Sequence, residues 1–405
     1  SIVLDSCLFD SNYASESAGF CYTDFSSLNK KFSFEAKNCI FKNNKTRNSD
    51  APAFGILSAS NSYIDINVIN TLFAGNLSFT NASALIRGDA NSRLSASFEN
   101  SIFLSNENVE GPDMISFPIV AGVGNGGSVS EVTAKNCLFA NNGGGIAVLN
   151  GTQSRATTQL INCTFYRNGR FVIAKNWSDV YVATDSVGHD LYIDNCIFWE
   201  PQANKLQLFT NNNFNNVTMY DYHINNSLVN LTDYVIPGAP ESYGPQVIFG
   251  IDPKFVNPAI GDFRLQKCSP AVNKGNNAAT NNANLIYDLD GSPRIFLDTV
   301  DLGAFEVQDS CIIVGDVDLP DIQSLTFGPN PAITGEIIHI NISNLSPGRI
   351  IWEMFDANAR TIETGNSYPI TNGGYTITAP DKPGVYFLRI KNSQIIYLIK
   401  FIVIR

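Results

Sequence analysis

A short motif that recurs along the chain constrains its fold more than any other feature. The motif has a polar residue, usually Asn, then Cys or another small residue, then usually an apolar residue and, in all but the last copy, Phe. The first copy reads Asp5–Phe9, and the others begin at Asn38, Asn70, Asn100, Asn136, Asn162, Asn195 and Asn226. From Asn38 onward the spacing is 26–36 residues. A repeat of this length is typical of a solenoid, in which each coil buries its apolar face against its neighbours.

Apolar and polar residues alternate before each Asn. In one coil Phe32, Phe34 and Ala36 alternate with Glu35 and Lys37. This period of two predicts a strand with one inward face. The alternation changes phase after the Asn, which predicts a sharp corner, because Asn tolerates the left-handed backbone conformation. The expected fold is therefore all-β: a parallel β-helix, right-handed by the usual crossover rule, with hydrogen-bonded Asn side chains stacked along the corner.

Composition excludes several classes of protein. The formal net charge of −11 argues against a nucleic-acid partner, which would require basic patches. The apolar content of 44% indicates a folded chain. No run approaches the ~20 apolar residues of a transmembrane helix. Because the chain begins inside a coil at Ser1 and without Met, we expect further residues before it in the natural protein.

Seven of the eight cysteines fall into two groups, and Cys21 lies outside the repeat. One group shares a slot of the repeat, where a small apolar residue would be buried and unpaired: Cys7, Cys39, Cys137, Cys163 and Cys196. Cys268 and Cys311 flank one segment outside the repeat and could form a disulfide bond. No cysteine pair has the spacing of a zinc site.

Residues 251–308 follow the β-helix of residues 1–250 and are rich in turns. Their position predicts a cap over the end of the solenoid. The motifs Asp252–Phe255, Gly261–Leu265, Ser269–Gly275, Asp288–Arg294 and Val300–Glu306 occur there in order. With these motifs the segment resembles the choice-of-anchor Q module that ends many bacterial β-helix surface proteins.

Within this segment, Asp288 and Asp290 form an Asp-x-Asp-Gly sequence. Such a sequence can contribute calcium ligands, but an ordinary turn has the same sequence, and without further ligands we favour the turn. No other cofactor is predicted.

An acidic linker, residues 309–323, precedes a second domain of residues 324–405. Gly and Pro turns divide this domain into short apolar runs, which predict an immunoglobulin-like β-sandwich. The expected strands are Ile337–Ile342, Arg349–Asp356, Tyr375–Thr378, Val385–Ile390 and Ile395–Ile404.

The second domain resembles the type A C-terminal sorting domain of the Bacteroidetes type IX secretion system. The resemblance is carried by Gly328–Ala332, Ile351–Asp356 with Arg360, Gly384–Ile390 and Lys400–Arg405. The residues that it marks as sorting signal are Pro329, Asn330, Pro331, Asp356, Arg360, Gly384, Tyr386, Lys400 and Arg405. Two positions depart from the pattern, since Gly328 stands where Tyr is usual and Ala359 where Gly is common.

The resemblance implies export across the outer membrane to the cell surface or the medium. The translocon and an outer-membrane shuttle protein would bind the domain, and a sortase or protease would act at the linker. A generic immunoglobulin-like adhesion domain is the alternative.

Two functions compete for residues 1–250. One is a non-catalytic adhesin that binds glycans or surfaces; the other is a polysaccharide lyase or glycosidase. Aligning the coils on their Asn places Asp190 beside Asp221 and Tyr192 beside His223, about 4.8 Å apart, on the outer face. This patch is the best catalytic candidate, but outward polar residues are also what any solvated face presents. We therefore favour the adhesin.

Overall fold

The computed structural model forms two compact units, Ser1–Ser310 and Cys311–Arg405. It describes residues 1–15, 18–24, 29–47, 51–79, 82–108, 117–151, 153–168, 180–183, 189–200, 220–230, 244, 246–296, 298–309, 325–342, 350–356, 360–367, 374–391 and 396–405. The predicted linker lies outside this part of the chain except for Asp309.

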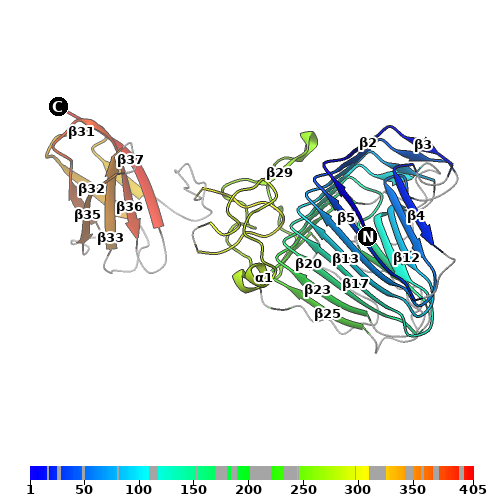
Figure 1. The fold of residues 1–405 in the computed structure, drawn as a ribbon. Helices are drawn as coiled ribbons and strands as arrows, with labels where there is room; N and C mark the ends of the chain where they lie inside the picture. The colour runs from blue at the N-terminus through cyan, green and yellow to red at the C-terminus, as the bar shows by residue number, and fades with distance from the viewer. Residues whose placement is uncertain are drawn as a thin grey trace. The chain divides into compact units, whose positions relative to one another are not determined.

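The first unit contains a parallel β-solenoid, as the repeat predicts (Figure 1). Its long strands form one sheet: β1 (Ile2–Asp5), β5 (Lys31–Lys37), β9 (Tyr63–Ile69), β13 (Arg93–Glu99), β17 (Val129–Lys135), β20 (Arg155–Ile161), β23 (His189–Asp194) and β25 (Tyr220–Asn225). Short strands after the Asn corner form a second: β2 (Leu8–Asp10), β6 (Ile40–Lys42), β10 (Leu72–Ala74), β14 (Ile102–Leu104), β18 (Leu138–Ala140), β21 (Thr164–Tyr166), β24 (Ile197–Trp199), β26 (Leu228–Val229) and β27 (Ile248–Phe249).

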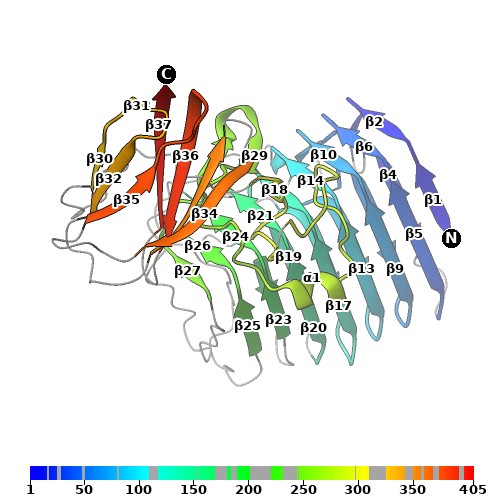
Figure 2. The ribbon, with the colours of Figure 1, turned by 90° about the vertical axis from the view of Figure 1, so that its left-hand side faces the viewer.

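Two further sheets close the coils. The larger contains β4 (Phe20–Asp24), β8 (Phe54–Ser58), β12 (Ala82–Gly88), β16 (Phe117–Val123), β19 (Ile146–Asn150) and β22 (Val180–Ala183). The smaller contains β3 (Tyr13–Ala14), β7 (Lys45–Thr46), β11 (Leu77–Ser78) and β15 (Glu107–Asn108). In all four sheets each strand pairs in parallel with the equivalent strand of the next coil, so that the same position of the repeat forms a row along the solenoid (Figure 2).

The Asn corner has the backbone conformation that the sequence predicts. The repeat Asn residues from Asn38 to Asn226 have φ between 40° and 58°, in the left-handed region. Their side chains also form the expected ladder: Asn70 Nδ2 donates to Asn38 Oδ1 at 3.3 Å, and Asn136 Nδ2 donates to Asn100 Oδ1 at 2.7 Å. Each coil is thus turned at the same point, which keeps the strands on both sides in register.

The core of the solenoid is built from the predicted inward residues. The Phe residues of the motif form a column, with ring centroids 4.6–5.2 Å apart and planes within 10° of parallel: Phe9, Phe41, Phe73, Phe103, Phe139, Phe165 and Phe198. The five cysteines of the repeat are unpaired, and all but Cys7 are buried, as predicted. Apolar burial of this kind contributes roughly 1.5–3 kcal/mol for each large side chain.

A second ladder of Asn residues, three positions after each of the first six Phe of the column, was not predicted; from Asn44 to Asn168 it is buried inside the solenoid. It consists of Asn12, Asn44, Asn76, Asn106, Asn142 and Asn168. Asn76 is fully buried; its Nδ2 donates to Phe41 O at 2.8 Å and to Asn106 Oδ1 at 2.9 Å. Its Oδ1 accepts from the backbone N of Asn44 at 3.2 Å. These bonds satisfy the polar groups that a second sharp corner leaves inside the core.

Residues 251–308 do not lie as the sequence predicts. We call this segment the cover; it contains β28 (Phe255–Asn257), β29 (Asp262–Leu265), a short 3₁₀ helix (Pro258–Ile260) and α1 (Asn277–Asn282). Instead of closing the end of the solenoid, it packs along the outer side of the short-strand sheet, and both ribbon views place α1 beside β20 (Figures 1 and 2). Its apolar residues Phe255, Phe263, Leu302 and others cluster with outward residues of β18, β21, β24 and β26.

The physical reason lies in the outward side chains of the short strands. Leu138, Ile197 and Leu228 point away from the solenoid core, yet they are 4%, 0% and 0% exposed. An apolar row of this kind has to be buried, and the cover buries it. The segment therefore covers the side of several coils, where the sequence predicted a cap over the end.

The second unit is a small β-sandwich, as predicted. One antiparallel sheet contains β30 (Leu325–Gly328), β32 (Ile337–Ile342) and β35 (Gly374–Thr378). The other contains β31 (Ala332–Ile333), β33 (Ile350–Asp356), β34 (Thr361–Ser367), β36 (Gly384–Lys391) and β37 (Ile396–Ile404). All five expected strands are present, and β30, β31 and β34 were missed. The unit has its own core, which includes Trp352, Leu388 and Phe401. Among the described residues no helix is long and apolar enough to cross a membrane.

Candidate functional site

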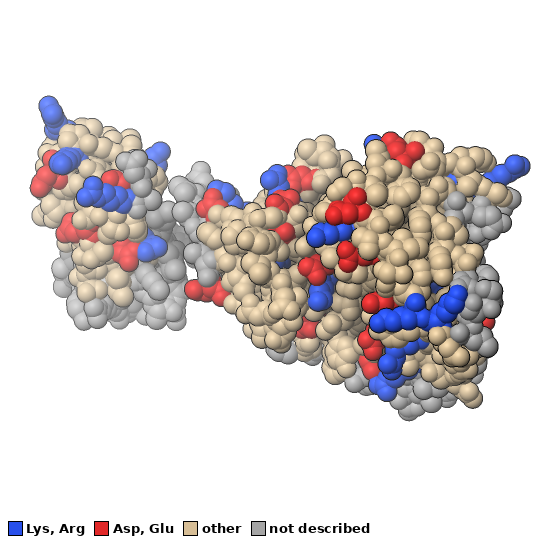
Figure 3. Space-filling view, viewed as in Figure 1, with Lys and Arg blue, Asp and Glu red and all other residues tan. Residues whose placement is uncertain are grey.

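The outer surface of the long-strand sheet carries the residues that the sequence singled out. We call it the polar face; it consists of the outward side chains of the long strands. Pairing in exact register places these side chains in straight rows, for example Ser33, Asp65, Ser95, Glu131 and Thr157. Positive and negative side chains lie close together on the surface, with no large area of one sign (Figure 3). The face therefore offers hydroxyl, amide and charged groups at one coil spacing, about 4.8 Å.

The strand register places the four residues of the predicted patch, Asp190, Asp221, Tyr192 and His223, on neighbouring strands as predicted. Asp190 pairs with Asp221, and Tyr192 pairs with His223, in the register of β23 and β25. The rings of Tyr192 and His223 are stacked, with centroids 5.0 Å apart and an angle of 5° between planes. The side chain of Asp221 lies outside the described part of the structure.

Asp190 has a basic partner that sequence alignment of the two coils did not reveal. Arg155, on the preceding coil, forms an ion pair with Asp190, with 2.5 Å between Nη2 and Oδ2. The two residues are not in the same row, because Arg155 pairs with Val129 and Thr157 pairs with Asp190. Arg155 lies two residues before Thr157, the residue opposite Asp190, and a long Arg side chain can reach diagonally from one row to the next. Only residues within one row were compared in the sequence, so this pair was not found.

Asp194, on the polar face, has a raised pKa. Burial raises the pKa of its carboxyl group, although Asn225 Nδ2 donates a hydrogen bond to Asp194 Oδ1 at 3.2 Å and His223 lowers the pKa. Asp194 lies four residues after Asp190 on the same strand, which corresponds to about 13 Å. This exceeds the roughly 5–9.5 Å between the two carboxyl groups of glycosidases. These two carboxyls therefore do not form such a pair, and Asp190 is held in an ion pair with Arg155.

The calcium candidates are arranged as a turn. The carboxylate of Asp288 accepts hydrogen bonds from the backbone N of Asp290 at 3.0 Å, Ser292 at 2.7 Å and Glu306 at 2.8 Å. Asp290 lies near Arg264, with 4.0 Å between Oδ2 and Nε. In the described ranges no three His, Cys, Asp or Glu residues are grouped as metal ligands. The contacts of Asp288 thus show a structural role in the cover.

A buried charge cluster fastens the cover to the solenoid. Arg294 has no exposed side-chain surface, and its Nη1 donates to Asn136 Oδ1 of the corner ladder at 3.3 Å. Its Nη2 donates to the carbonyl groups of Asp301 and Gly303 at 3.1 and 2.6 Å and lies 3.7 Å from Glu306 Oε2. Burial raises the pKa of Glu306 to about 8, and the nearby Asp301 adds to the effect.

This cluster predicts how the cover responds to pH. The pKa of Glu306 is about 8 in the folded protein and 4.5 in the unfolded chain. Between pH 4.5 and pH 8 the folded protein therefore keeps a proton on Glu306 that the unfolded chain has lost. The contribution of Glu306 to stability is therefore fully present below pH 4.5 and is lost as the pH rises through 8, by about 2–3 kcal/mol between pH 5 and pH 7. Urea unfolding at both pH values measures this. Glu306→Gln should remove most of the dependence, whereas Glu131→Gln, on the polar face, should retain it; equal slopes in both variants would contradict the assignment.

The landmarks of the sorting-domain resemblance lie at turns and strand ends. Asn330 Oδ1, between Pro329 and Pro331, accepts from the backbone N of Ile402 at 3.0 Å. Asp356 Oδ1 accepts from the backbone N of Arg360 at 3.0 Å, at the turn between β33 and β34. The hydroxyl of Tyr386, two residues after Gly384, donates to Lys382 O at 2.8 Å. Lys400 and Arg405 are exposed on and after β37. The hydrogen bonds of Asn330, Asp356 and Tyr386 all join a side chain to a main-chain group, so these three side chains stabilise turns and strand ends of the sandwich.

The predicted disulfide bond concerns one described residue. Cys268 is disulfide-bonded. Cys311, the partner that the sequence suggests, lies outside the described residues, so the pairing stays a prediction.

The comparisons with known proteins add no family to this description. No protein-family model, curated protein or solved structure was found to match the chain.

Proposed function

We propose that this protein is a non-catalytic, glycan-binding β-solenoid of the bacterial cell surface, exported by the type IX system through its C-terminal domain. The observation that supports the binding role is the polar face. Its rows present hydroxyl, amide and aromatic groups at a spacing of about 4.8 Å, close to the length of one sugar unit in an extended polysaccharide.

Aromatic side chains lie toward both ends of this face. Tyr63, on β9, is 36% exposed, and Lys31 Nζ lies 5.3 Å from the centre of its ring. Tyr192, on β23, stacks with His223. Between them lie polar side chains of one row: Asn67, Ser97, Thr133 and Gln159. Aromatic rings supply area for sugar rings, and amides and hydroxyls supply hydrogen bonds.

The export role is supported by a different observation. The residues that resemble a sorting domain form a sandwich with its own core, separate from the solenoid core. In this proposal the translocon and its shuttle bind the exposed strands and turns, and the linker is the place of processing.

The binding role is tested with the purified full-length chain and a panel of acidic and neutral polysaccharides, scoring binding and cleavage together. We expect the double variant Tyr63→Ala, Tyr192→Ala to bind a recognised polysaccharide about tenfold or more weakly. Tyr13→Ala, at a 64% exposed Tyr outside the polar face, is the matched control and should bind normally.

Two results would contradict this role. If the double variant and Tyr13→Ala lost affinity for the polysaccharide equally, the binding site would not be the polar face. Cleavage abolished by Asp190→Asn or Asp221→Asn would instead establish a lyase or glycosidase.

A further inference from the structure

The outer side of the short-strand sheet has a covered and an open half. We call this side the flank; it consists of the corner Asn ladder and the outward residues of the short strands. In the covered half Asn136, Asn162 and Asn195 are fully buried beneath the cover. In the open half Asn38 and Asn70 are exposed. Both halves have the same row of corner Asn residues, but the cover packs on only one of them.

The apolar row of the flank shows the same division. Leu138 and Ile197 are 4% and 0% exposed, whereas Leu8 and Ile40, in the same row, are 60% and 37% exposed. Leu72 and Ile102 lie between these two pairs and are partly buried. Exposed apolar side chains in a continuous row often mark a binding surface for another polypeptide. The exposed end of this row is such a surface.

The covered half shows what kind of chain this surface binds. The corner Asn side chains donate through Nδ2 to main-chain carbonyl groups of the cover: Asn136 to Tyr287 O at 3.1 Å, Asn162 to Asp301 O at 3.3 Å, Asn195 to Asn276 O at 3.0 Å and Asn226 to Lys274 O at 3.1 Å. Beside these bonds, apolar side chains of the cover, such as Leu302, pack on the apolar row. The ligand of the covered half is therefore an irregular polypeptide, held by its carbonyl oxygens and apolar side chains.

The open half retains the donors for such a ligand. Each ladder amide has two N–H groups; Asn136 uses one for Asn100 and the other for the carbonyl of Tyr287. Asn70 makes the equivalent ladder bond to Asn38 at 3.3 Å. Its second N–H can then bond a carbonyl group laid along the flank, as in the covered half.

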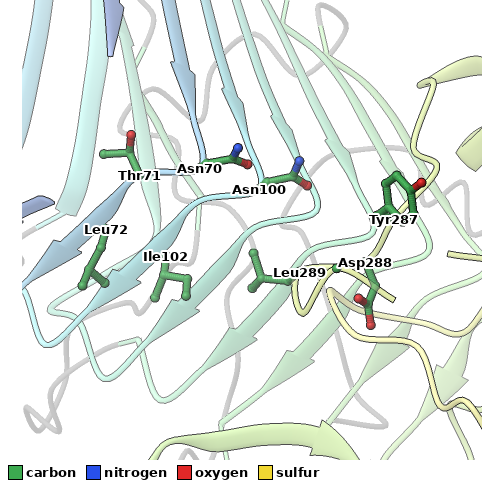
Figure 4. Close-up of a pocket in the computed structure, with 9 residues that line it drawn as sticks. Asn70, Thr71, Leu72, Asn100, Ile102, Tyr287, Asp288 and Leu289 are labelled. Carbon is green, nitrogen blue, oxygen red and sulfur yellow. The ribbon is translucent and has the colours of Figure 1, made fainter. Parts of the chain in front are cut away.

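A cavity of about 510 Å³ lies where the cover stops (Figure 4). Asn70, Leu72, Asn100 and Ile102 line it from the solenoid, and Tyr287, Leu289 and Gly291 line it from the cover. At this end of the cover, Ile286 and Tyr287 are 71% and 57% exposed. A second polypeptide could therefore continue the line of the cover, with a side chain in the cavity.

We propose that the open half of the flank binds an extended polypeptide segment of a partner protein, in the manner of the cover. The segment would carry small or branched apolar side chains against Ile40, Leu72 and Ile102, and its carbonyl groups would accept from Asn38 and Asn70. This interface continues the one that the cover already makes along the same rows.

The test uses a labelled synthetic peptide with the cover sequence, residues 283–306, and the full-length protein. We expect saturable binding by fluorescence anisotropy and no binding of a scrambled peptide. Leu72→Asp should weaken binding by at least about tenfold, because it places a charge against apolar side chains. Ile40→Asp, farther from the cavity, should do the same without disturbing the cover. Asn67→Asp introduces the same charge on the polar face of the same coil and should have no effect.

Three results would overturn the proposal. The first is the failure of the peptide to bind the unmodified protein. Equal affinity for unmodified protein and both Asp variants of the flank would show exchange with the native cover or unspecific binding. Dimerisation of the protein, abolished by Ile40→Asp in light scattering, would make a second copy of the chain the occupant.

Discussion

Replacing Asn76 by leucine is expected to lower the free energy of unfolding by about 3–5 kcal/mol. Asn76 is fully buried, and its side chain makes hydrogen bonds to Asn44, Asn106 and the carbonyl of Phe41. Leucine has nearly the same size but satisfies none of these groups. At least two buried polar groups would lose a partner, each at a cost of about 1–3 kcal/mol. Urea unfolding followed by circular dichroism measures the change.

Asn67→Leu is the control for this substitution. Asn67 lies on β9 of the same coil, on the polar face, and donates only a long bond of 3.4 Å to Glu35. Its replacement should change stability by less than about 0.5 kcal/mol. If Asn67→Leu destabilised the protein as much as Asn76→Leu, the inner ladder would have no special role.

Deletion of residues 324–405 is expected to abolish surface display and leave the protein in the periplasm of a host with a type IX system. The reason is that the proposed translocon signal lies wholly within the second unit. The hydrophobic cores of the solenoid and the cover share no residue with the core of that unit, so both should fold without it. Protease accessibility on intact cells, with cell fractionation, measures the location. Normal surface display of the shortened chain would refute the sorting role.

The reciprocal chain serves as its control. A reporter fused before residues 311–405 should reach the cell surface, because this range forms one compact unit. A reporter retained in the periplasm, together with a retained deletion variant, would indicate that export also requires the first unit.

Much of the solenoid could be predicted because its signals are local. Asn38 and Asn70 mark a left-handed corner, which few residue types tolerate, and the alternation in strands such as Phe32–Ala36 distinguishes inside from outside directly. The inner ladder has a local signal as well: Asn76 follows Phe73 by three residues, and the same spacing recurs from coil to coil. This signal was missed because an Asn in a turn has many ordinary explanations.

The place of the cover could not be predicted from the same rules. It depends on contacts between residues far apart in the sequence, such as Arg294 with Asn136. The outward row of Leu138, Ile197 and Leu228 signals that something covers this side, but not which segment. The ion pair of Arg155 with Asp190 was missed for a related reason, since it joins different rows of neighbouring coils.

The column of Phe rings has a consequence for how this protein can vary in length. Each ring faces the next at one coil spacing, so inserting or removing part of a coil would break the column and both Asn ladders together. Loops between strands are free of this constraint, and the 26–36-residue spacing of the repeats shows their variation. The solenoid can therefore lengthen or shorten only in whole coils, and its reach changes in fixed steps of about 4.8 Å.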